Sequence, residues 1–516
     1  MDHSNNIILV TFDQHRIDYP TMSYSVASIL ATLKHYKIRA SHYSFDIRDF
    51  KQIEEGSFSA EILNLYGITE YLKQFSCIAF GVSRWSDTYA YMLIRRLNDS
   101  GYKGKIVVGG YEITAMNENH PITGILNIQH FIQGYSEKPL VKLMQGKYTD
   151  DQKFIREELD PEYLFSPYAE GILNTYSRKI YWETKRGCTY HCGFCEWGNA
   201  HTGMLSLNTE TIERDIKIFE QSTIDEINIL DATFNVKNDY QGILNKLVNR
   251  TNSKITFQAR FEALKPEFLQ FCASHKDRLH LEFGLQTIHK NEMEVIGRQN
   301  KISLIKEKLH ELNQLGIDYE VSIIYAIPGQ TITSFIDTIE FLRVNQCQKI
   351  MAYPLQIPLN SNLENKIKDY QIRFREDEFY VKSVASSFSF TKEEREDMDQ
   401  IALSLVHAQK PSGIIPKYLS KIENAQFQYE FNSVYFQNRG KMSEPIVLRI
   451  GGIDTCFYDA TSVEDIASNG LDPVFFPKQL SENNKRVQPE NFYYKVVFGE
   501  SGHFYTYGDF KREDHA

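Results

Sequence analysis

Three closely spaced cysteines are the clearest chemical feature of this sequence. Cys188, Cys192 and Cys195 lie in the segment "CTYHCGFC", with three residues between the first two and two residues between the last two. Thiolates grouped in this way can reach neighbouring irons of one 4Fe–4S cluster without help from distant segments. Because three local ligands leave one iron open, and an open metal position is what chemistry requires, the spacing indicates a reactive cluster.

A zinc site is the alternative reading of the same loop. Structural zinc usually takes its fourth ligand from a second short pair, and the other cysteines stand singly in the sequence. His191 and His201 keep a site with three cysteines and one histidine open. We expect the remaining cysteines to be apolar core thiols: Cys77, Cys272, Cys347 and Cys456.

Composition narrows the class of protein. The chain has 516 residues, 42% of them hydrophobic, which is enough for two or three domains. A formal net charge of -10 argues against a nucleic-acid partner, because neutralising phosphates takes clustered Lys and Arg. The N-terminal residues do not resemble a signal peptide and no apolar run approaches membrane-spanning length, so we expect a cytoplasmic protein with no membrane partner. An odd number of cysteines, seven, fits a reducing compartment.

Short β-rich runs alternate with helical patterns over the first 150 residues. The pattern predicts an α/β fold with a Rossmann-like, doubly wound parallel sheet, whose ligands bind at the carboxyl ends of the strands. We expect residues 1–150 to form this domain and residues 151–178 to be a linker. The predicted strands are 6–12, 39–45, 76–83, 104–110 and 128–132.

A second β/α series follows the linker. It predicts a partial (β/α)6 barrel like a TIM barrel over residues 179–380, with its chemistry at the strand carboxyl ends and the cysteine loop directly after the first strand. Residues 381–516 are expected to form an α+β module over the substrate, with a helix at 391–410 and a C-terminal hairpin. The predicted barrel strands are 179–185, 227–231, 255–260, 278–284, 319–327 and 349–357.

The C-x-x-x-C-x-x-C spacing, with Phe194 before the last cysteine, resembles the radical S-adenosylmethionine (SAM) superfamily. The resemblance implies that Cys188, Cys192 and Cys195 hold a 4Fe–4S cluster. It also implies that the open iron chelates the amino and carboxylate groups of SAM, and that Phe194 packs near its adenine.

Further landmarks continue this resemblance. The segments "NILDATFNV" (228–236), "FGLQT" (283–287) and "AIPGQT" (326–331) are similar to family motifs, whereas Asn360 and Ser361 replace a Gly-Thr pair in a fourth. The resemblance implies SAM contacts for Asp231, Gln286 and Arg298. From the residues alone, Asp231 could equally cap a turn, Gln286 could bond backbone groups at a strand end, and Arg298 could be a solvated charge on a helix.

The first domain resembles cobalamin-binding domains that precede radical SAM barrels. The resemblance rests on "FGVSRWS" (80–86), "VVGGYEIT" (107–114) and "IQGYSEKPLVKLMQG" (132–146). Tight turns in a Rossmann-like sheet are the alternative reading of the glycines. His15, in "DQHRID", is similar to a cobalt-ligating histidine, with a plain loop histidine as the alternative. The residues implied at cobalamin are Ser83, Gly109, Gly110, Gly134 and Glu137.

Together the resemblances imply a cobalamin-dependent radical SAM enzyme of the class B methyltransferase type. It would methylate an unactivated carbon of a small-molecule or peptide substrate through a 5′-deoxyadenosyl radical and methylcobalamin, with electrons from an external donor of flavodoxin or ferredoxin type. The same parts could instead perform cyclisation, rearrangement or transfer of another SAM-derived group. An inactive, metal-stabilised binding module is the alternative outside enzymes.

Overall fold

The computed structural model describes residues 6–13, 20, 22–46, 65–83, 85–114, 116, 123, 127–195, 197, 203–237, 239–359, 361–376, 381–408, 446–450, 453–457, 494–498 and 502–506. Two compact units divide the chain. The first comprises Met1–Phe283, Met293–Asp318 and Gln356–Val384, and the second comprises Gly284–Glu292, Tyr319–Leu355 and Ala385–Ala516. Across the described ranges, no helix combines the length and apolar character needed to cross a bilayer.

A six-stranded parallel sheet occupies the N-terminal part of the first unit, in the order β2-β1-β3-β4-β5-β6. This order confirms the predicted doubly wound sheet and places its topological switch point between β1 and β3. Its strands are β1 (Asn6–Asp13), β2 (Arg39–Asp46), β3 (Cys77–Gly81), β4 (Lys105–Gly109), β5 (His130–Gln133) and β6 (Phe154–Arg156).

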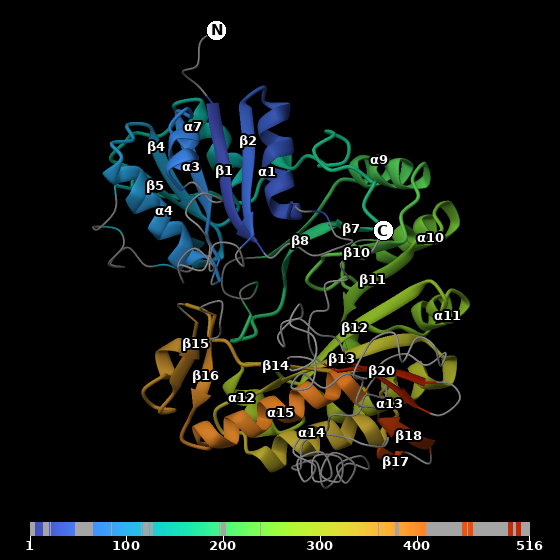
Figure 1. The fold of residues 1–516 in the computed structure, drawn as a ribbon. Coiled ribbons are helices and arrows are strands. Elements are labelled where there is room, and N and C mark those ends of the chain that lie inside the picture. Colours follow the sequence, from blue (N-terminus) through green and yellow to red (C-terminus); the bar gives the residue numbers. More distant parts are fainter. Residues whose placement is uncertain are drawn as a thin grey trace. The chain divides into compact units, whose positions relative to one another are not determined.

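Helices cover both faces of this sheet because successive strand residues point to opposite sides. Ile8 and Val10 face α4 and the end of α3, whereas Ile7 and Leu9 face α1 and α7 (Figure 1). The helices are α1 (Tyr24–His35), α3 (Leu65–Leu72), α4 (Asp87–Asp99), the short α5 (Tyr111–Thr114) and α7 (Glu137–Met144).

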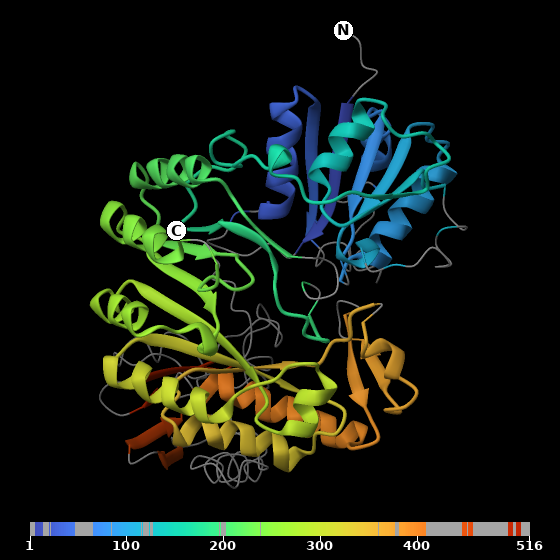
Figure 2. The same cartoon turned by 180° about the vertical axis from the view of Figure 1, so that it is seen from behind.

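The second sheet follows chain order, β14-β13-β12-β11-β10-β7, as a partial barrel requires. Within the first unit, α9, α10 and α11 lie along one side of their strands (Figures 1 and 2). The strands are β7 (Lys179–Trp182), β10 (Glu226–Ile229), β11 (Lys254–Ala259), β12 (Leu279–Gln286), β13 (Asp318–Tyr325) and β14 (Ile350–Pro354). The helices are α9 (Thr209–Glu220), α10 (Tyr240–Arg250), α11 (Pro266–Ser274), α12 (Lys290–Val295), α13 (Ile302–Leu315) and α14 (Ile332–Val344).

The predicted first barrel strand, 179–185, is wrong at its end. Strand β7 stops at Trp182, and Lys185–Cys188 forms a separate strand, β8, which pairs antiparallel with β9 (Gly203–Ser206). The break occurs because Thr184 and Lys185 turn their backbone amides toward the Asp231 carboxylate. The cysteine loop therefore follows a two-stranded ribbon and not the barrel strand itself.

After the barrel the chain forms β15 (Arg373–Glu376), β16 (Lys382–Ser386) and α15 (Lys392–Ala408). Four antiparallel strands end it: β17 (Ile446–Ile450), β18 (Ile453–Phe457), β19 (Tyr494–Phe498) and β20 (Gly502–Thr506). The predicted helix and the predicted C-terminal hairpin, β19 with β20, are both present. The domain boundaries at 150, 178 and 380 stay predictions.

Candidate functional site

The cysteine loop, residues 188–195, is partly enclosed and held at its backbone. Cys188 and Cys192 are both 8% exposed, and Cys195 and Phe194 are half-buried. The Cys195 amide donates to the Cys192 carbonyl at 3.1 Å, which forms a tight turn between these two cysteines. The Gly193 amide donates to the Ile296 carbonyl at 2.8 Å, so the loop is anchored to the segment after α12.

Two arginines flank this loop. Arg298 is 8% exposed, and its guanidinium donates to the Cys192 sulfur and to Asn300 Oδ1, the latter at 3.1 Å. Arg260 lies over the Tyr190 ring with its guanidinium carbon 3.8 Å from the ring centroid. Positive charge beside the loop would complement a metal cluster held by thiolate ligands. Arg298 is buried and not the solvated helix charge of the alternative reading.

Three other thiols lie in a different environment, whereas the side chain of Cys456 lies outside what the structure describes. Burial raises the pKa of Cys77, Cys272 and Cys347 to about 12 in each case, so these groups stay protonated. This agrees with the expectation that they fill apolar cores. The donor set of the loop, three cysteines beside guanidinium groups, fits a 4Fe–4S cluster with one iron lacking a protein ligand. His191, the described candidate for a fourth zinc ligand, is exposed.

Asp231 lies buried beneath the start of β8. One of its oxygens accepts from the Thr184 and Lys185 amides at 2.8 and 3.1 Å, and the other accepts from Thr184 Oγ1 at 2.5 Å. Lys185 Nζ donates to the carbonyls of Phe234 and Val236, both at 2.6 Å. Burial lowers the pKa of Lys185 to about 8 and raises that of Asp231. Asp231 thus holds backbone in this structure, and its contact with SAM stays a prediction.

Gln286 is the last residue of β12 and belongs to the second unit. Its backbone is left-handed, with φ at +71°, an uncommon conformation for a residue other than glycine, and the residue is 8% exposed. The next residue, Thr287, donates through Oγ1 to Glu292 Oε2 at 2.5 Å, and Glu292 is fully buried. Gln330 Nε2 and Ser334 Oγ also donate to Glu292, at 3.0 and 2.6 Å. The loops that follow β12 and β13 are therefore tied to one carboxylate.

Ser83 lies two residues beyond β3, at the switch point of the N-terminal sheet. Its amide donates to Ser86 Oγ at 2.8 Å, and the Trp85 indole donates to the Phe12 carbonyl at 3.2 Å. This loop is therefore fastened to the carboxyl end of β1, the edge where a doubly wound sheet binds ligands.

The three predicted glycines differ in what their missing side chains do. A Cβ on Gly110 would lie 2.3 Å from the Val82 carbonyl oxygen, so close backbone packing already requires glycine there. A Cβ on Gly109 would lie 3.2 Å from Ser136 Oγ. Gly134 has φ at +93°, and among the described residues other than its two chain neighbours no atom lies within 4 Å of its Cβ position. The space beside Gly134 fits close approach of a large ligand, and the cobalamin contacts stay predictions.

Glu137, the first residue of α7, is buried in an ion pair. Its carboxylate accepts from the Arg186 guanidinium, and Ser28 Oγ donates to it at 2.8 Å. Arg186 Nε also donates to Glu183 Oε2 at 2.7 Å, and burial raises the pKa of Glu183 to about 7. Sequence reasoning did not identify Arg186, although its place two residues before Cys188 in "KRGC" was a usable signal.

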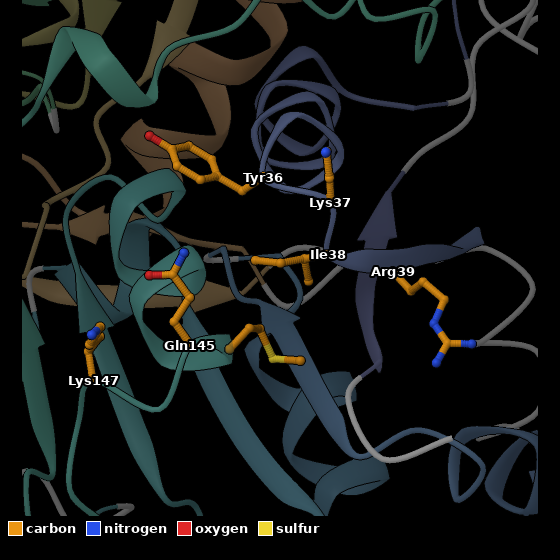
Figure 3. Close-up of a pocket in the computed structure, with 7 residues that line it drawn as sticks. Tyr36, Lys37, Ile38, Arg39, Gln145 and Lys147 are labelled. Carbon is orange, nitrogen blue, oxygen red and sulfur yellow. The ribbon is translucent and has the colours of Figure 1, made fainter. Parts of the chain in front are cut away.

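A groove with a volume of about 620 Å³ lies at the other edge of the N-terminal sheet (Figure 3). Arg39 begins β2 and Tyr36 and Gln145 follow helices α1 and α7, so the groove is at the amino ends of the strands. Parallel sheets bind ligands at their carboxyl ends, and we give the carboxyl edge more weight for that reason. His15, His201 and Asn360 lie outside the described residues.

Comparison with known proteins agrees with this geometry. Residues 182–342 match the family model of the radical SAM superfamily. Over 247 residues the chain is 25% identical to the cobalamin-dependent radical SAM methyltransferase TokK of Streptomyces tokunonensis. That alignment covers 42% of this chain and 35% of TokK, so only about a third of the relative's length is matched.

Two solved structures share the fold. The radical SAM methyltransferase TsrM from Kitasatospora setae, solved with cobalamin and a 4Fe–4S cluster bound, aligns with a TM-score of 0.52 and 14% identity over 71% of this chain and 75% of TsrM. The cobalamin-dependent SAM radical enzyme OxsB aligns with a TM-score of 0.57 and 12% identity over 84% of this chain and 71% of OxsB. The resemblance inferred from the cysteine motif is thereby confirmed: this chain contains a radical SAM domain, and that domain includes all three clustered cysteines.

Proposed function

We propose that this chain is a cobalamin-dependent radical SAM methyltransferase acting on an unactivated carbon of a small-molecule or peptide substrate. The observation that carries the proposal is the loop with Cys188, Cys192 and Cys195 beside two guanidinium groups, joined to a parallel sheet with Ser83 at its switch point. Support comes from the relatives, since TokK is named a cobalamin-dependent radical SAM methyltransferase and TsrM, a radical SAM methyltransferase, was solved with cobalamin and a 4Fe–4S cluster.

The described residues divide into those proposed for the cluster, for SAM and for the corrin. The three cysteines would hold the cluster, and the residues proposed around SAM are Phe194, Asp231, Gln286 and Arg298. The residues proposed around cobalamin are Ser83, Gly109, Gly110, Gly134 and Glu137. When bound, the cluster supplies the electron for reductive cleavage of SAM and the corrin supplies a methyl carrier.

The chain's own contribution is to position groups and to exclude water. Arg298 donates to the Cys192 sulfur and so helps to fix its position. The Gly193 amide fixes the loop on the Ile296 carbonyl, which limits the motion of the adjacent cysteines. Burial of Cys188 and Cys192 shields their sulfurs from solvent and oxidants. An external one-electron donor of flavodoxin or ferredoxin type completes the proposal.

A reducing, cytoplasmic setting is part of the same proposal. Cys77, Cys272 and Cys347 are buried thiols outside disulfides, as is usual where thiols stay reduced.

The test is methyl transfer from SAM that carries a labelled methyl group. Protein reconstituted anaerobically with iron, sulfide, cobalamin and reductant is expected to yield 5′-deoxyadenosine, S-adenosylhomocysteine and labelled product. Cys192→Ala should abolish 5′-deoxyadenosine and labelled product, whereas Cys347→Ala, which removes a core thiol, should retain both. Formation of 5′-deoxyadenosine with an unlabelled, cyclised or rearranged product would replace methyl transfer by another radical reaction. Absence of both nucleoside products across small-molecule and peptide substrates would favour the inactive binding module.

A further inference from the structure

Arg186 occupies the centre of a buried polar network in the first unit. Its side chain is 5% exposed, and its three nitrogens contact Glu137, Glu183 and Ser28. Arg186 Nη2 donates to Ser28 Oγ at 2.7 Å, and the guanidinium carbon lies 5.2 Å from the centroid of the Tyr135 ring. Each of the three guanidinium nitrogens thereby has a partner in a different direction, which is a geometry that arginine, and not lysine, can satisfy.

The partners of Arg186 come from two different parts of the sequence. Ser28 lies on α1 and Glu137 begins α7, so both belong to the helices that cover the N-terminal sheet. Glu183 lies between β7 and β8, and Arg186 itself lies in β8. Separations of 158 residues to Ser28 and 49 residues to Glu137 make this a tertiary link between the sheet and the start of the barrel.

The link is adjacent to both candidate cofactor positions. Arg186 is followed by Gly187, whose φ is +84°, and then by Cys188. On the other side, Tyr135 and Glu137 continue directly from Gly134, the glycine with open space at its Cβ position. One guanidinium therefore contacts the loop of residues 134–137 and lies two residues from the first cysteine.

Stability alone is a weak reason for such a network. Taking a guanidinium and two carboxylates out of water carries a desolvation penalty that apolar packing would avoid, and buried ion pairs often add little net stability for that reason. A buried, hydrogen-bonded ion pair does fix the geometry between the chain segments that carry its charged residues.

We propose that Arg186 is a positioning residue that fixes the cysteine loop relative to the loop of residues 134–137. The nature of the two ligands that it holds in register, a cluster and a corrin, rests on the proposed function. The mechanical coupling between the two loops does not, so the two can fail separately.

The test measures hydrogen exchange in protein without added cofactors, so that it is independent of catalysis. Arg186→Lys keeps a positive charge but loses the fork, and Glu137→Gln keeps the size and the bond to Ser28. Both variants are expected to exchange about tenfold faster at residues 134–140 and at residues 185–195 together, because local opening then costs less. Faster exchange only in the mutated segment would overturn the proposal.

Arg250→Met is the matched control. Arg250 also bonds two glutamates, Glu213 and Glu220, but its side chain is 23% exposed, it ends α10 and both partners lie on α9. Exchange at both loops should remain as in the unmodified chain. If Arg250→Met accelerates the two loops as much as Arg186→Lys does, general destabilisation explains the effect and the proposal fails.

A second readout concerns the ligands. Arg186→Lys is expected to retain iron, because all three cysteines remain, yet to bind hydroxocobalamin about tenfold more weakly and to release more 5′-deoxyadenosine per methylated product. Unchanged corrin affinity together with unchanged product ratio would contradict the positioning role. If the unmodified chain also binds neither iron nor hydroxocobalamin, the proposed function is contradicted. The hydrogen-exchange result would still decide whether Arg186 couples the two loops.

Discussion

Two buried carboxylates organise this molecule in different ways. Glu137 in the first unit is paired with the Arg186 guanidinium, whereas Glu292 in the second unit accepts from the neutral donors Thr287, Gln330 and Ser334. Two of those neutral donors also have a second acceptor, since Gln330 Nε2 lies 3.3 Å from the Ile324 carbonyl and Ser334 Oγ lies 3.1 Å from that of Thr331.

Because one network is charged and the other has neutral donors, a substitution should change the free energy of unfolding differently in each. Removing the arginine from the first network leaves the Glu137 carboxylate buried without its ion-pair partner. Removing an acceptor from the second network leaves donors that can turn to backbone carbonyls. We therefore expect the network of Arg186 to be sensitive and the network of Glu292 to be tolerant.

The largest expected effect is that of Arg186→Met. The free energy of unfolding should fall by about 3–5 kcal/mol, because a buried pair is broken from one side. Urea unfolding measures it, with Arg250→Met expected to cost less than about 1 kcal/mol as a more exposed pair. Equal losses in the two variants would show that burial does not make the Arg186 network more sensitive than a more exposed pair.

The pH dependence of stability should report Glu183. Burial, offset in part by Arg186, raises its pKa from 4.5 to about 7, with Asp231 and Glu137 adding repulsion and Tyr24 lying close enough to interact with it. Native protein thus binds a proton that unfolded protein has lost between pH 4.5 and 7. Stability from this group is complete below pH 4.5 and declines as pH rises through 7, by up to about 3 kcal/mol.

Glu183→Gln removes this titration. The urea midpoint of the unmodified chain should fall more between pH 5 and pH 8 than that of the variant. The comparison is between slopes, since the substitution also removes a charge from Arg186. Parallel slopes would show that Glu183 is ionised throughout.

A smaller loss is expected for Glu292→Gln. The amide keeps one acceptor oxygen, and two donors have carbonyl alternatives, so the cost should be about 1–2 kcal/mol. Glu294→Gln, on the exposed face of the same short helix, is the matched control. A loss as large as that of Arg186→Met would show that the neutral network is not tolerant.

The smallest effects should come from single hydroxyls. Ser334→Ala removes one donor to Glu292, and Ser28→Ala removes a hydroxyl that bonds both Arg186 and Glu137. We expect about 0.5 kcal/mol for the first and about 1.5 kcal/mol for the second, because bonds to charged groups are stronger. Thermal unfolding of the two variants side by side measures the difference. A larger loss in Ser334→Ala than in Ser28→Ala would contradict the expectation that the charged network is the more sensitive one.

Strand positions and the family were predictable, because apolar runs and cysteine spacing are local signals. The predicted strand at 104–110 became β4 at Lys105–Gly109, and that at 319–327 became β13 at Asp318–Tyr325. Strand β8 was missed because its separation from β7 depends on Asp231, which is 47 residues away from Thr184.

The buried networks were not predictable for the same reason. Ser28 and Glu137 are 109 residues apart, and nothing local marks either as a partner of Arg186. Gln286 could be placed by its motif, but its left-handed backbone could not, since glutamine rarely adopts it.

The metal content of protein prepared without oxygen tests whether the three clustered cysteines hold a 4Fe–4S cluster. We expect about four irons per chain, lost when Cys188, Cys192 and Cys195 are together replaced by alanine and kept in Cys347→Ala. One zinc per chain, or iron that survives the triple replacement, would contradict that expectation.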